Sequence, residues 1–338
     1  MERDIDLVIP MVFPQDPEWQ REYRRRCGGS TAGDAAGTVG NVRWRSWGTE
    51  ELLVKCCMKY MPWLRCIYIL LAQESQARFL NGGYESHEAT AGEAAGTVPE
   101  VRLVFHREFM PAEVLPCFSS PCIEMFLHRI PGLSERFIYA NDDMFPLSPL
   151  EPDDFFYYRA TNAADVVKGV AGAELFTLCS PLLPCQHIYE LAYPKNPNIF
   201  QRKCMWQQNM VGRAFGQQYA RTWLRNGHSF AAILKSSCEE VWRRYGKEIR
   251  RNLSSLKRTD RSANHYIYQL YQYFTGMYVD HDLKKQYVGD GVATDRLADL
   301  IRDPQAGIVC INDNEKEKDW KRRAEIVRRE IEAKLDNS

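Results

Sequence analysis

The sequence has no excess of charge of either sign. Its 338 residues include 44 Lys and Arg and 44 Asp and Glu. A protein whose main partner is nucleic acid or a strongly anionic surface usually carries a large positive excess. The balance therefore argues against such partners, and any site that works through charge must be local.

Long hydrophobic runs are also missing. The longest strongly apolar run, residues 66–72, is far shorter than the roughly 20 residues that a membrane-spanning helix needs. Residues 1–6 lack the basic segment and apolar stretch with which a secretory signal begins. We expect an unexported protein of the cytoplasm, at most peripheral at the inner membrane face, without a transmembrane segment.

Several common cofactor motifs are absent as well. There is no Gly-x-x-x-x-Gly-Lys-Ser/Thr loop and no Gly-x-Gly-x-x-Gly after the first predicted strand, which argues against an NTPase and a dinucleotide-dependent oxidoreductase. The eleven cysteines lack the spacing of a structural zinc site. Their odd number in an unexported chain favours reduced thiols.

What the sequence does contain is a set of short apolar runs rich in β-branched and aromatic residues. Such runs predict buried strands, here at 6–12, 66–72, 101–106, 136–140 and 307–311. Nearly continuous apolar sequence is typical of strands covered on both faces, as in a mainly parallel sheet. Helical segments are expected between the strands, for example at 50–60 and 119–129. The sequence predicts an α/β fold with a Rossmann-like, glycosyltransferase-A-like core.

The rest of the chain fits one catalytic domain, 1–338, with additions to this core. The expected parts are an α/β core at 1–175 and 305–315, loop insertions at 28–41 and 82–99, an appended helical subdomain at 200–280 and a C-terminal helix at 319–338. The two insertions nearly repeat each other and consist of small residues, which bury too little area to offset their ordering entropy. They are expected to be surface loops, and a flap over the site is the alternative.

The most informative short segment is Asn141-Asp142-Asp143, which directly follows the apolar run 136–140. Ligands of open α/β sheets bind outside the carboxyl ends of the strands. On a regular strand Asn141 and Asp143 would share one side and Asp142 would lie opposite, unless the chain turns there. One Asp would bind a metal while the other orients a group or accepts a proton. A turn or helix cap remains the alternative, because Asn and Asp favour both.

Acidic and amide residues follow two other predicted strands. Asn312 and Asp313 come directly after the run 307–311, and Asp16 follows the first strand. Oxygen ligands from separate strands would then meet at one edge of the sheet. This kind of ligand suits Mg²⁺ or Mn²⁺ with a phosphate-bearing substrate completing the coordination shell.

A longer pattern surrounds these residues. Residues 115–124 read Leu-Pro-x-Phe-x-Ser-x-x-Ile-Glu, and residues 127–145 read Leu-His-Arg-Ile-Pro-Gly-Leu-Ser-Glu-x-Phe-Ile-Tyr-x-Asn-Asp-Asp-Met-Phe. This pattern resembles the second conserved region of the Stealth family. The family's first, third and fourth regions resemble residues 6–19, 228–276 and 310–314 of this chain.

The Stealth family contains bacterial capsular polysaccharide phosphotransferases and the lysosomal-enzyme N-acetylglucosamine-1-phosphotransferase. The resemblance implies transfer of a hexose 1-phosphate from a nucleotide-diphosphate sugar to a sugar hydroxyl, with release of the nucleoside monophosphate, in capsular or exopolysaccharide synthesis. It also implies a UDP-sugar as the default donor and an oligosaccharide or polysaccharide as the acceptor.

Phosphoryl transfer requires alignment of the acceptor and neutralisation of charge rather than covalent catalysis by the protein. We expect Asp143 and Asp313 to bind the metal with Asp142 close by, and Arg258 to hold phosphate oxygens with its planar fork. His228 is the expected general base, because an imidazole titrates near working pH. The expected substrate-binding residues are Asp6, Asp16, Lys55, Asn141 and Asn312. For Arg258 a solvated basic surface, and for His228 a structural role, are the alternatives.

Two other functions stay open at this point. An ordinary metal-dependent glycosyltransferase would use a similar carboxylate site but release the nucleoside diphosphate. A non-catalytic glycan- or nucleotide-binding protein is the second, because Phe13 stands where the Stealth family usually has Asp.

Overall fold

The computed structural model describes residues 4–27, 46–80, 98–158, 182–217, 221–281, 283, 285–288, 294–312 and 320–336. The insertion predicted at 28–41, and all but the last two residues of that at 82–99, lie outside these ranges.

A five-stranded sheet forms the centre of the molecule, with strand order β10-β4-β1-β2-β3. Its strands are β10 (Ala231–Leu234), β4 (Arg136–Tyr139), β1 (Ile5–Pro10), β2 (Cys66–Leu71) and β3 (Glu100–Phe105). The pairs β4–β1, β1–β2 and β2–β3 are parallel, and β10 is an antiparallel edge strand. Four of the five predicted strands therefore lie here, and the parallel α/β core predicted from the sequence is confirmed.

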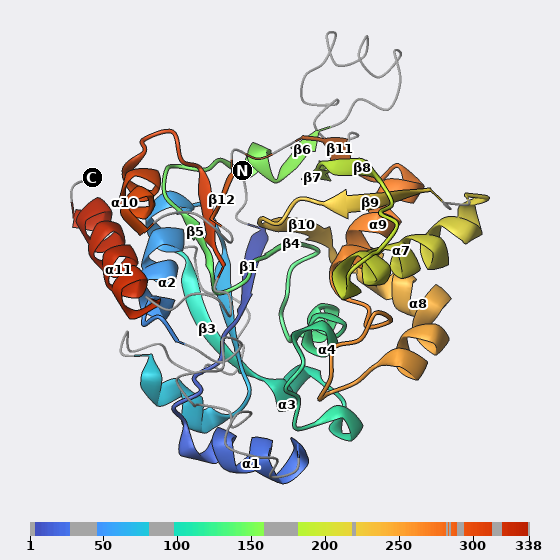
Figure 1. Cartoon of the computed structure of the whole chain (residues 1–338), viewed down its shortest axis with the longest axis horizontal. Coiled ribbons are helices and arrows are strands. Elements are labelled where there is room, and N and C mark those ends of the chain that lie inside the picture. The colour runs from blue at the N-terminus through green and yellow to red at the C-terminus, as the bar shows by residue number, and fades with distance from the viewer. Residues whose placement is uncertain are drawn as a thin grey trace, which may run out of the picture.

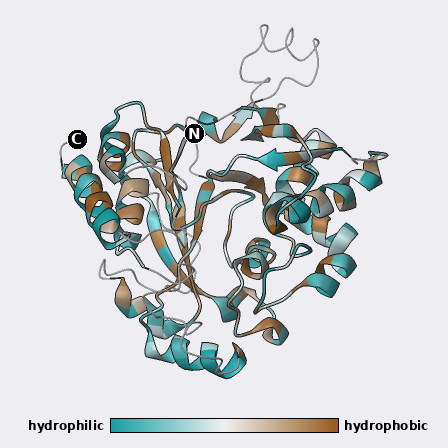
Figure 2. Cartoon of the chain, viewed as in Figure 1, coloured by the Kyte–Doolittle hydropathy of each residue, from teal (hydrophilic) through white to brown (hydrophobic). Residues whose placement is uncertain are grey.

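Both faces of this sheet are buried, which explains the nearly continuous apolar strands. Leu7 and Ile67 point into one hydrophobic cluster, whereas Val8 and Tyr68 point into the other. Helices α2 (Glu50–Tyr60), α10 (Thr294–Arg302) and α11 (Trp320–Asp336) cover the first face, as Figure 1 shows. Helices α4 (Ser120–Glu124), α8 (Lys235–Asn252) and α9 (Tyr266–Thr275) cover the second. Coloured by hydropathy, the strands of the sheet are predominantly apolar and the outer helices are mixed (Figure 2).

The fifth predicted strand is not in the central sheet. Strand β13 (Ile308–Ile311) lies between β12 (Lys285–Val288) and β5 (Met144–Pro146) in a separate three-stranded sheet. The reason is local: β5 begins immediately after the Asn141–Asp143 segment, and β13 pairs antiparallel with β5. Residues 308–312 thus reach the Asn-Asp-Asp segment through this small sheet.

The region predicted as helical, 200–280, contributes to both sheet and helices. It contains α7 (Ile199–Gly212), α8 and α9, but also β9 (Thr222–Asn226) and β10, and β10 is an edge strand of the central sheet. The predicted helix at 119–129 is the short α4 followed by a 3₁₀ turn at Leu127–Arg129. The remaining α-helices and strands of the described residues are α1 (Pro17–Cys27), α3 (His106–Phe109), β6 (Phe156–Tyr158), β7 (Leu182–Gln186), β8 (Ile188–Ala192) and β11 (Val279–Asp280).

The strand order creates a crevice between β1 and β4. The chain runs outward from β1 to β2 and β3, and then returns to the other side of β1 to form β4. Such a reversal is the point at which ligands bind in open α/β sheets, just outside the carboxyl ends of the strands. The fold therefore places the end of β1, near Pro10, and the end of β4, near Tyr139, at the expected binding position.

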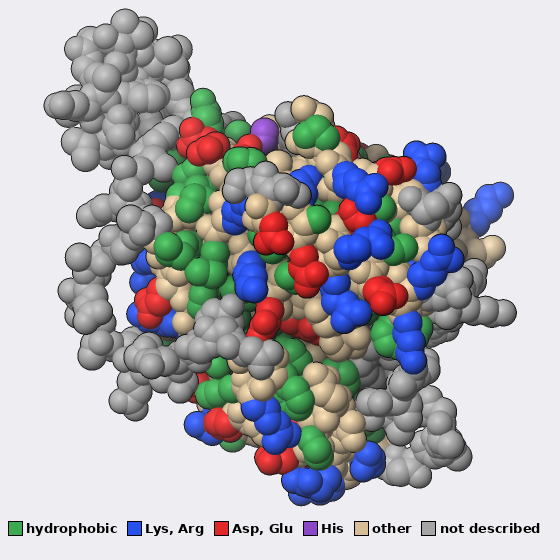
Figure 3. All heavy atoms as spheres, turned by 90° about the vertical axis from the view of Figure 1, so that its left-hand side faces the viewer, with side chains coloured by type: hydrophobic (Ala, Val, Ile, Leu, Met, Phe, Trp, Pro, Cys, Tyr) green, Lys and Arg blue, Asp and Glu red, His purple; other side chains and the backbone are tan. Residues whose placement is uncertain are grey.

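The outer surface carries both signs of charge. Figure 3 shows basic and acidic side chains interspersed on the face that holds α10 and α11. One such group joins Glu330 to Arg302 and Arg329 through hydrogen bonds of 2.6 to 3.0 Å. Within the described part of the chain, none of the helices combines the length and the apolar character required to cross a membrane.

Candidate active site

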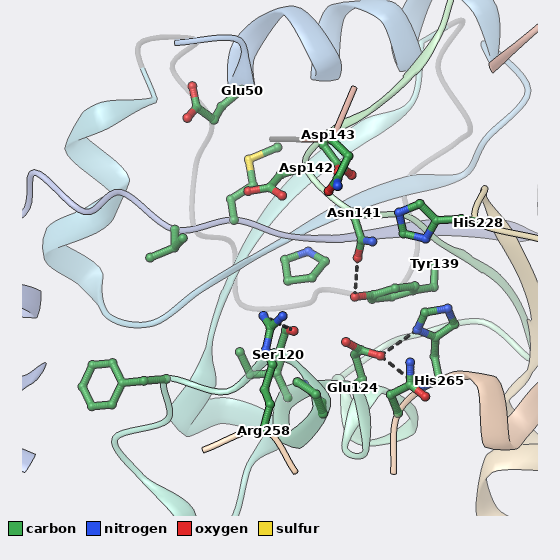
Figure 4. Close-up of a pocket in the computed structure, with 18 of the residues that line it drawn as sticks. Glu50, Ser120, Glu124, Tyr139, Asn141, Asp142, Asp143, His228, Arg258 and His265 are labelled. Atoms are coloured by element: carbon green, nitrogen blue, oxygen red, sulfur yellow. Dashed lines mark hydrogen bonds and ion pairs between the residues drawn. The ribbon is translucent and has the colours of Figure 1, made fainter. Parts of the chain in front are cut away.

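A cavity of about 480 Å³ lies at the carboxyl ends of β1 and β4. It is lined by residues from both halves of the chain, and six of them were predicted as site residues. These six are Asn141, Asp142, Asp143, His228, Arg258 and Asn312. Figure 4 shows Asp142 and Asp143 on one side of the cavity, Arg258 on the opposite side, and His228 and His265 along the flank.

The Asn-Asp-Asp segment is a turn that connects β4 to β5. The Met144 N–H donates to the Asn141 carbonyl at 3.3 Å, and the Ile311 N–H donates to the Asp143 carbonyl at 2.8 Å. The Tyr139 hydroxyl donates to Asn141 Oδ1 at 2.9 Å. The NH₂ group of Asn141 can therefore donate a hydrogen bond to a phosphate oxygen. The turn was the alternative interpretation of this segment. The segment does form a turn, and its three residues also line the cavity.

The two carboxyl groups lie in an environment that disfavours negative charge. Burial raises the pKa of Asp142 to about 7, and the nearby Asp143 and Glu50 add repulsion. Burial also raises the pKa of Asp143 to about 6, against a hydrogen bond from Cys310. Asp143 Oδ1 is buried, and no described residue bonds it. A buried carboxylate oxygen with no partner beside a second carboxyl group fits a divalent cation that prefers oxygen ligands.

A thiol and an imidazole lie beside Asp143. Potential ligand atoms of Asp143, His228 and Cys310 lie within 4.8 Å of one another. Burial and the Asp143 carboxyl group raise the pKa of the Cys310 thiol far above its ordinary value, so this thiol is protonated and donates to Asp143. That hydrogen bond accounts for the contact of Cys310 with Asp143, which no pattern in the sequence had indicated.

Three imidazoles, those of His106, His228 and His265, line the cavity, and His228 is the one that was predicted as general base. Burial is the main cause that lowers the pKa of His228 to about 4, and the nearby His265 and Arg225 side chains lower it further. His265 lies with Nδ1 at 2.6 Å from Glu124 Oε2. Glu124 belongs to the family-like pattern at 115–124, but its partner is 141 residues away in the sequence, so no spacing pattern could have indicated the pair.

Two cationic side chains line the cavity, and Arg258 lies across it from Asp142 and Asp143. Arg258 is exposed, and its Nη2 donates to Ser120 Oγ at 2.8 Å, which holds the guanidinium at the cavity. Lys203 also lines the cavity, and burial lowers its pKa despite the opposing effect of Glu124. Lys203 was not predicted, because a single Lys in a helical region carries no signal in the sequence.

Three predicted substrate-binding residues lie outside the cavity. Asp6 is near the amino end of β1, at the opposite edge of the sheet, where Arg65 binds both of its carboxylate oxygens at 2.9 and 2.6 Å. Asp16 precedes α1, accepts from the Glu18 N–H at 3.1 Å and pairs with Arg78 at 2.8 Å. These two carboxylates have protein partners that engage them in the folded chain.

Lys55 is an exposed residue of α2 and does not line the cavity. Asp313, the second predicted metal ligand, lies outside the described residues. Its neighbour Asn312 does line the cavity, next to the end of β13.

Comparison with known proteins links this geometry to one family. A family model described as Stealth protein conserved region 2 matches residues 43–164, which include α2, α4, β4 and the Asn-Asp-Asp turn. The capsular polysaccharide phosphotransferase WcwK of Streptococcus pneumoniae is 25% identical over 316 residues, covering 91% of this chain and 90% of the relative. The receptor polysaccharide phosphotransferase WefC of Streptococcus gordonii is 26% identical over 320 residues, covering 93% and 91%.

A third relative, the capsular polysaccharide phosphotransferase cps12A of Actinobacillus pleuropneumoniae, is 33% identical over 153 residues, 45% of this chain and 38% of the relative. The fold and site thus define an α/β protein with an acidic turn at the switch point of a parallel sheet. Residues 43–164 of this chain match the second conserved region of the Stealth family.

Proposed function

We propose that this protein transfers a hexose 1-phosphate from a nucleotide-diphosphate sugar to a sugar hydroxyl and releases the nucleoside monophosphate. The relatives that match almost the whole chain are named polysaccharide phosphotransferases. The single observation that carries the proposal is that Asp142 and Asp143 face Arg258 across one cavity. A diphosphate bound there would meet cationic groups on one side and carboxyl groups able to hold its counter-ion on the other.

The carboxyl side of the cavity fits Mg²⁺ or Mn²⁺. Asp142 and Asp143 would hold the ion, and Asn312 offers a further oxygen. When bound, such an ion would neutralise charge on the diphosphate as the leaving group departs. Its positive charge would also favour the ionised form of both carboxyl groups, whose pKa is raised mainly by burial.

The cationic side would hold the non-bridging phosphate oxygens. Arg258 presents a planar fork that can bind two oxygens at once, and Lys203 supplies a point charge. The Asn141 NH₂ group can donate to a third oxygen. Positioning and neutralisation of this kind are the main requirements for phosphoryl transfer.

The proposal includes a UDP-sugar as donor, an oligosaccharide or polysaccharide as acceptor, and capsule or exopolysaccharide synthesis as the process. It places the reaction in the cytoplasm, with at most peripheral contact with the inner membrane face, and assigns the core to the glycosyltransferase-A type. These details rest on the resemblance to the family.

A product assay tests the reaction type. Purified protein is incubated with Mg²⁺, a panel of UDP-sugars and an oligosaccharide acceptor, and the nucleotides are separated by chromatography. We expect UMP and an acceptor that carries a sugar through a phosphodiester. Release of UDP would instead identify a glycosyltransferase, and metal-dependent binding of the nucleotide sugar without either product would identify a binding protein.

The residue that suggested a binding protein lies away from the cavity. Phe13, which stands in place of the family's Asp, is 2% exposed and stacks on Phe79 with ring centroids 5.5 Å apart. It belongs to the hydrophobic core and does not line the cavity. The carboxyl groups that do line the cavity are present.

A further inference from the structure

A second histidine of the cavity is held by its own carboxylate. His265 precedes α9 and Glu124 ends α4, and each residue is 5% exposed. Glu124 Oε2 contacts His265 twice, at 2.6 Å from Nδ1 and at 3.0 Å from the backbone nitrogen. The dashed lines of Figure 4 mark both contacts.

Glu124 is ionised in this environment. Burial alone would raise the pKa of Glu124, but the hydrogen bonds from His265 and the proximity of the His265 and Lys203 side chains outweigh burial and lower this pKa to about 2. A carboxylate can only accept hydrogen bonds, so Nδ1 of His265 must carry the proton. In the neutral ring, Nε2 then bears the lone pair that can accept a proton.

The position of the ring leaves Nε2 for the cavity. His265 lines the cavity, and within the described ranges no protein group forms a hydrogen bond with Nε2. The ring packs against Tyr139 at 4.5 Å and Tyr266 at 4.4 Å between centroids, which limits its rotation. The charged and titratable groups around it are Glu124, Lys203, His228, Arg258, Tyr139 and Tyr266.

We propose that His265 is the general base for the acceptor hydroxyl and that Glu124 is the residue that positions it. This assignment rests on the proposed function. The acceptor oxygen forms a bond to the sugar-linked phosphorus as its proton moves to Nε2. The bond from that phosphorus to the bridging oxygen breaks, and the nucleoside monophosphate leaves with the electron pair. The proton on Nε2 returns to water after product release.

His228 occupies a different part of the cavity. Its ring lies beside Asp143 and Cys310, on the side of the carboxyl groups. His265 lies beside Glu124, below Tyr139 in Figure 4, and its ring is oriented by that carboxylate. The arrangement of an oriented histidine with one free nitrogen is the one that general bases use in other enzymes.

The decisive variant is His265→Asn. The Asn NH₂ group can take the place of Nδ1–H and keep the contact with Glu124, but Nε2 is lost. Provided that the wild-type enzyme releases the nucleoside monophosphate, we expect the kcat of His265→Asn to be about 10²- to 10⁴-fold lower than that of wild type. The KM of this variant for the donor should stay unchanged. His128→Asn is the matched control, because His128 is also largely buried but packs on Trp242 outside the cavity. This control should keep the wild-type kcat.

Chemical rescue separates a base from a structural residue. In His265→Ala, added imidazole should restore part of kcat in proportion to its concentration, while Tm stays near that of His128→Asn. Glu124→Gln, which keeps an oxygen for the backbone N–H but loses the charge, should lower kcat less than His265→Asn does. If His265→Asn keeps the wild-type kcat, or if imidazole does not restore the kcat lost in His265→Ala, then His265 is not the general base. Either result would leave the proposed function itself intact. Failure of the wild-type enzyme to release any nucleoside monophosphate would overturn the proposed function itself.

Discussion

The backbone N–H of Ile311 donates to the carbonyl oxygen of Asp143 at 2.8 Å. This hydrogen bond joins the end of β13 to the acidic turn after β4, although the two segments are far apart in the sequence. Because of it, Asn312 lies in the same cavity as Asp142 and Asp143. The bond orients the turn through its backbone, so the two carboxyl side chains are left for a ligand.

Replacing one of these carboxyl groups should separate catalysis from stability. We expect Asp143→Asn to reduce transfer by at least about 10²-fold, since the proposed ion and its charge neutralisation are lost. Without divalent cation the variant should be at least as stable as wild type, because a neutral amide avoids the cost of a buried, unpaired charge. Thermal unfolding with and without Mg²⁺ checks this, since only the wild type should gain Tm from the ion. Wild-type activity in Asp143→Asn would contradict the site.

The guanidinium of Arg258 should act on the donor. Arg258→Ala is expected to raise the donor KM or lower kcat/KM by roughly 10- to 100-fold, the effect of about 1.5–3 kcal/mol for hydrogen bonds to a charged group. Arg258→Lys keeps the charge but not the planar fork, so it should restore only part of kcat/KM. Arg261→Ala is the control, because Arg261 is an exposed neighbour that does not line the cavity. Equal kinetics in the Arg258 and Arg261 variants would show that the basic run is only a solvated surface.

Asp6 should affect stability and not catalysis. Its carboxylate is 0% exposed and binds both Arg65 and the Ser134 N–H, the latter at 2.7 Å. Asp6→Ala would leave these donors without their acceptor, so we expect a loss of about 1–3 kcal/mol in the free energy of unfolding. The kcat and donor KM of the folded fraction should match wild type. Urea denaturation together with steady-state kinetics measures both quantities.

The Glu124–His265 pair predicts an acid-sensitive contribution to stability. The pKa of Glu124 falls from 4.5 to about 2 in the folded protein, so the unfolded chain binds more protons between these values. The contribution is complete above pH 4.5 and is lost as pH falls toward 2, with a magnitude of up to about 3 kcal/mol. Urea unfolding at pH 7 and pH 3 should therefore show a smaller acid loss for Glu124→Gln than for wild type. An equal loss in both proteins would contradict the charge state given to Glu124.

The local pattern of the chain was sufficient for much of the core. Apolar runs placed β1, β2, β3 and β4 close to their observed bounds, and the helix expected at 50–60 is α2. These elements depend on residues that are near one another in the sequence. The strand at 307–311 was also found, but its sheet was not, because pairing with β5 depends on how the turn after β4 directs the chain.

For the site, the sequence indicated six of the residues that line the cavity, namely Asn141, Asp142, Asp143, His228, Arg258 and Asn312. Only the tertiary structure decided which polar groups stay available. Asp6 and Asp16 are engaged by Arg65 and Arg78 because strand direction and helix position bring those arginines to them. The carboxylate that orients His265 belongs to Glu124, which is 141 residues away in the sequence. The sequence specifies the type of each side chain. The packing of segments that are distant in the sequence determines which partner sets its charge and orientation.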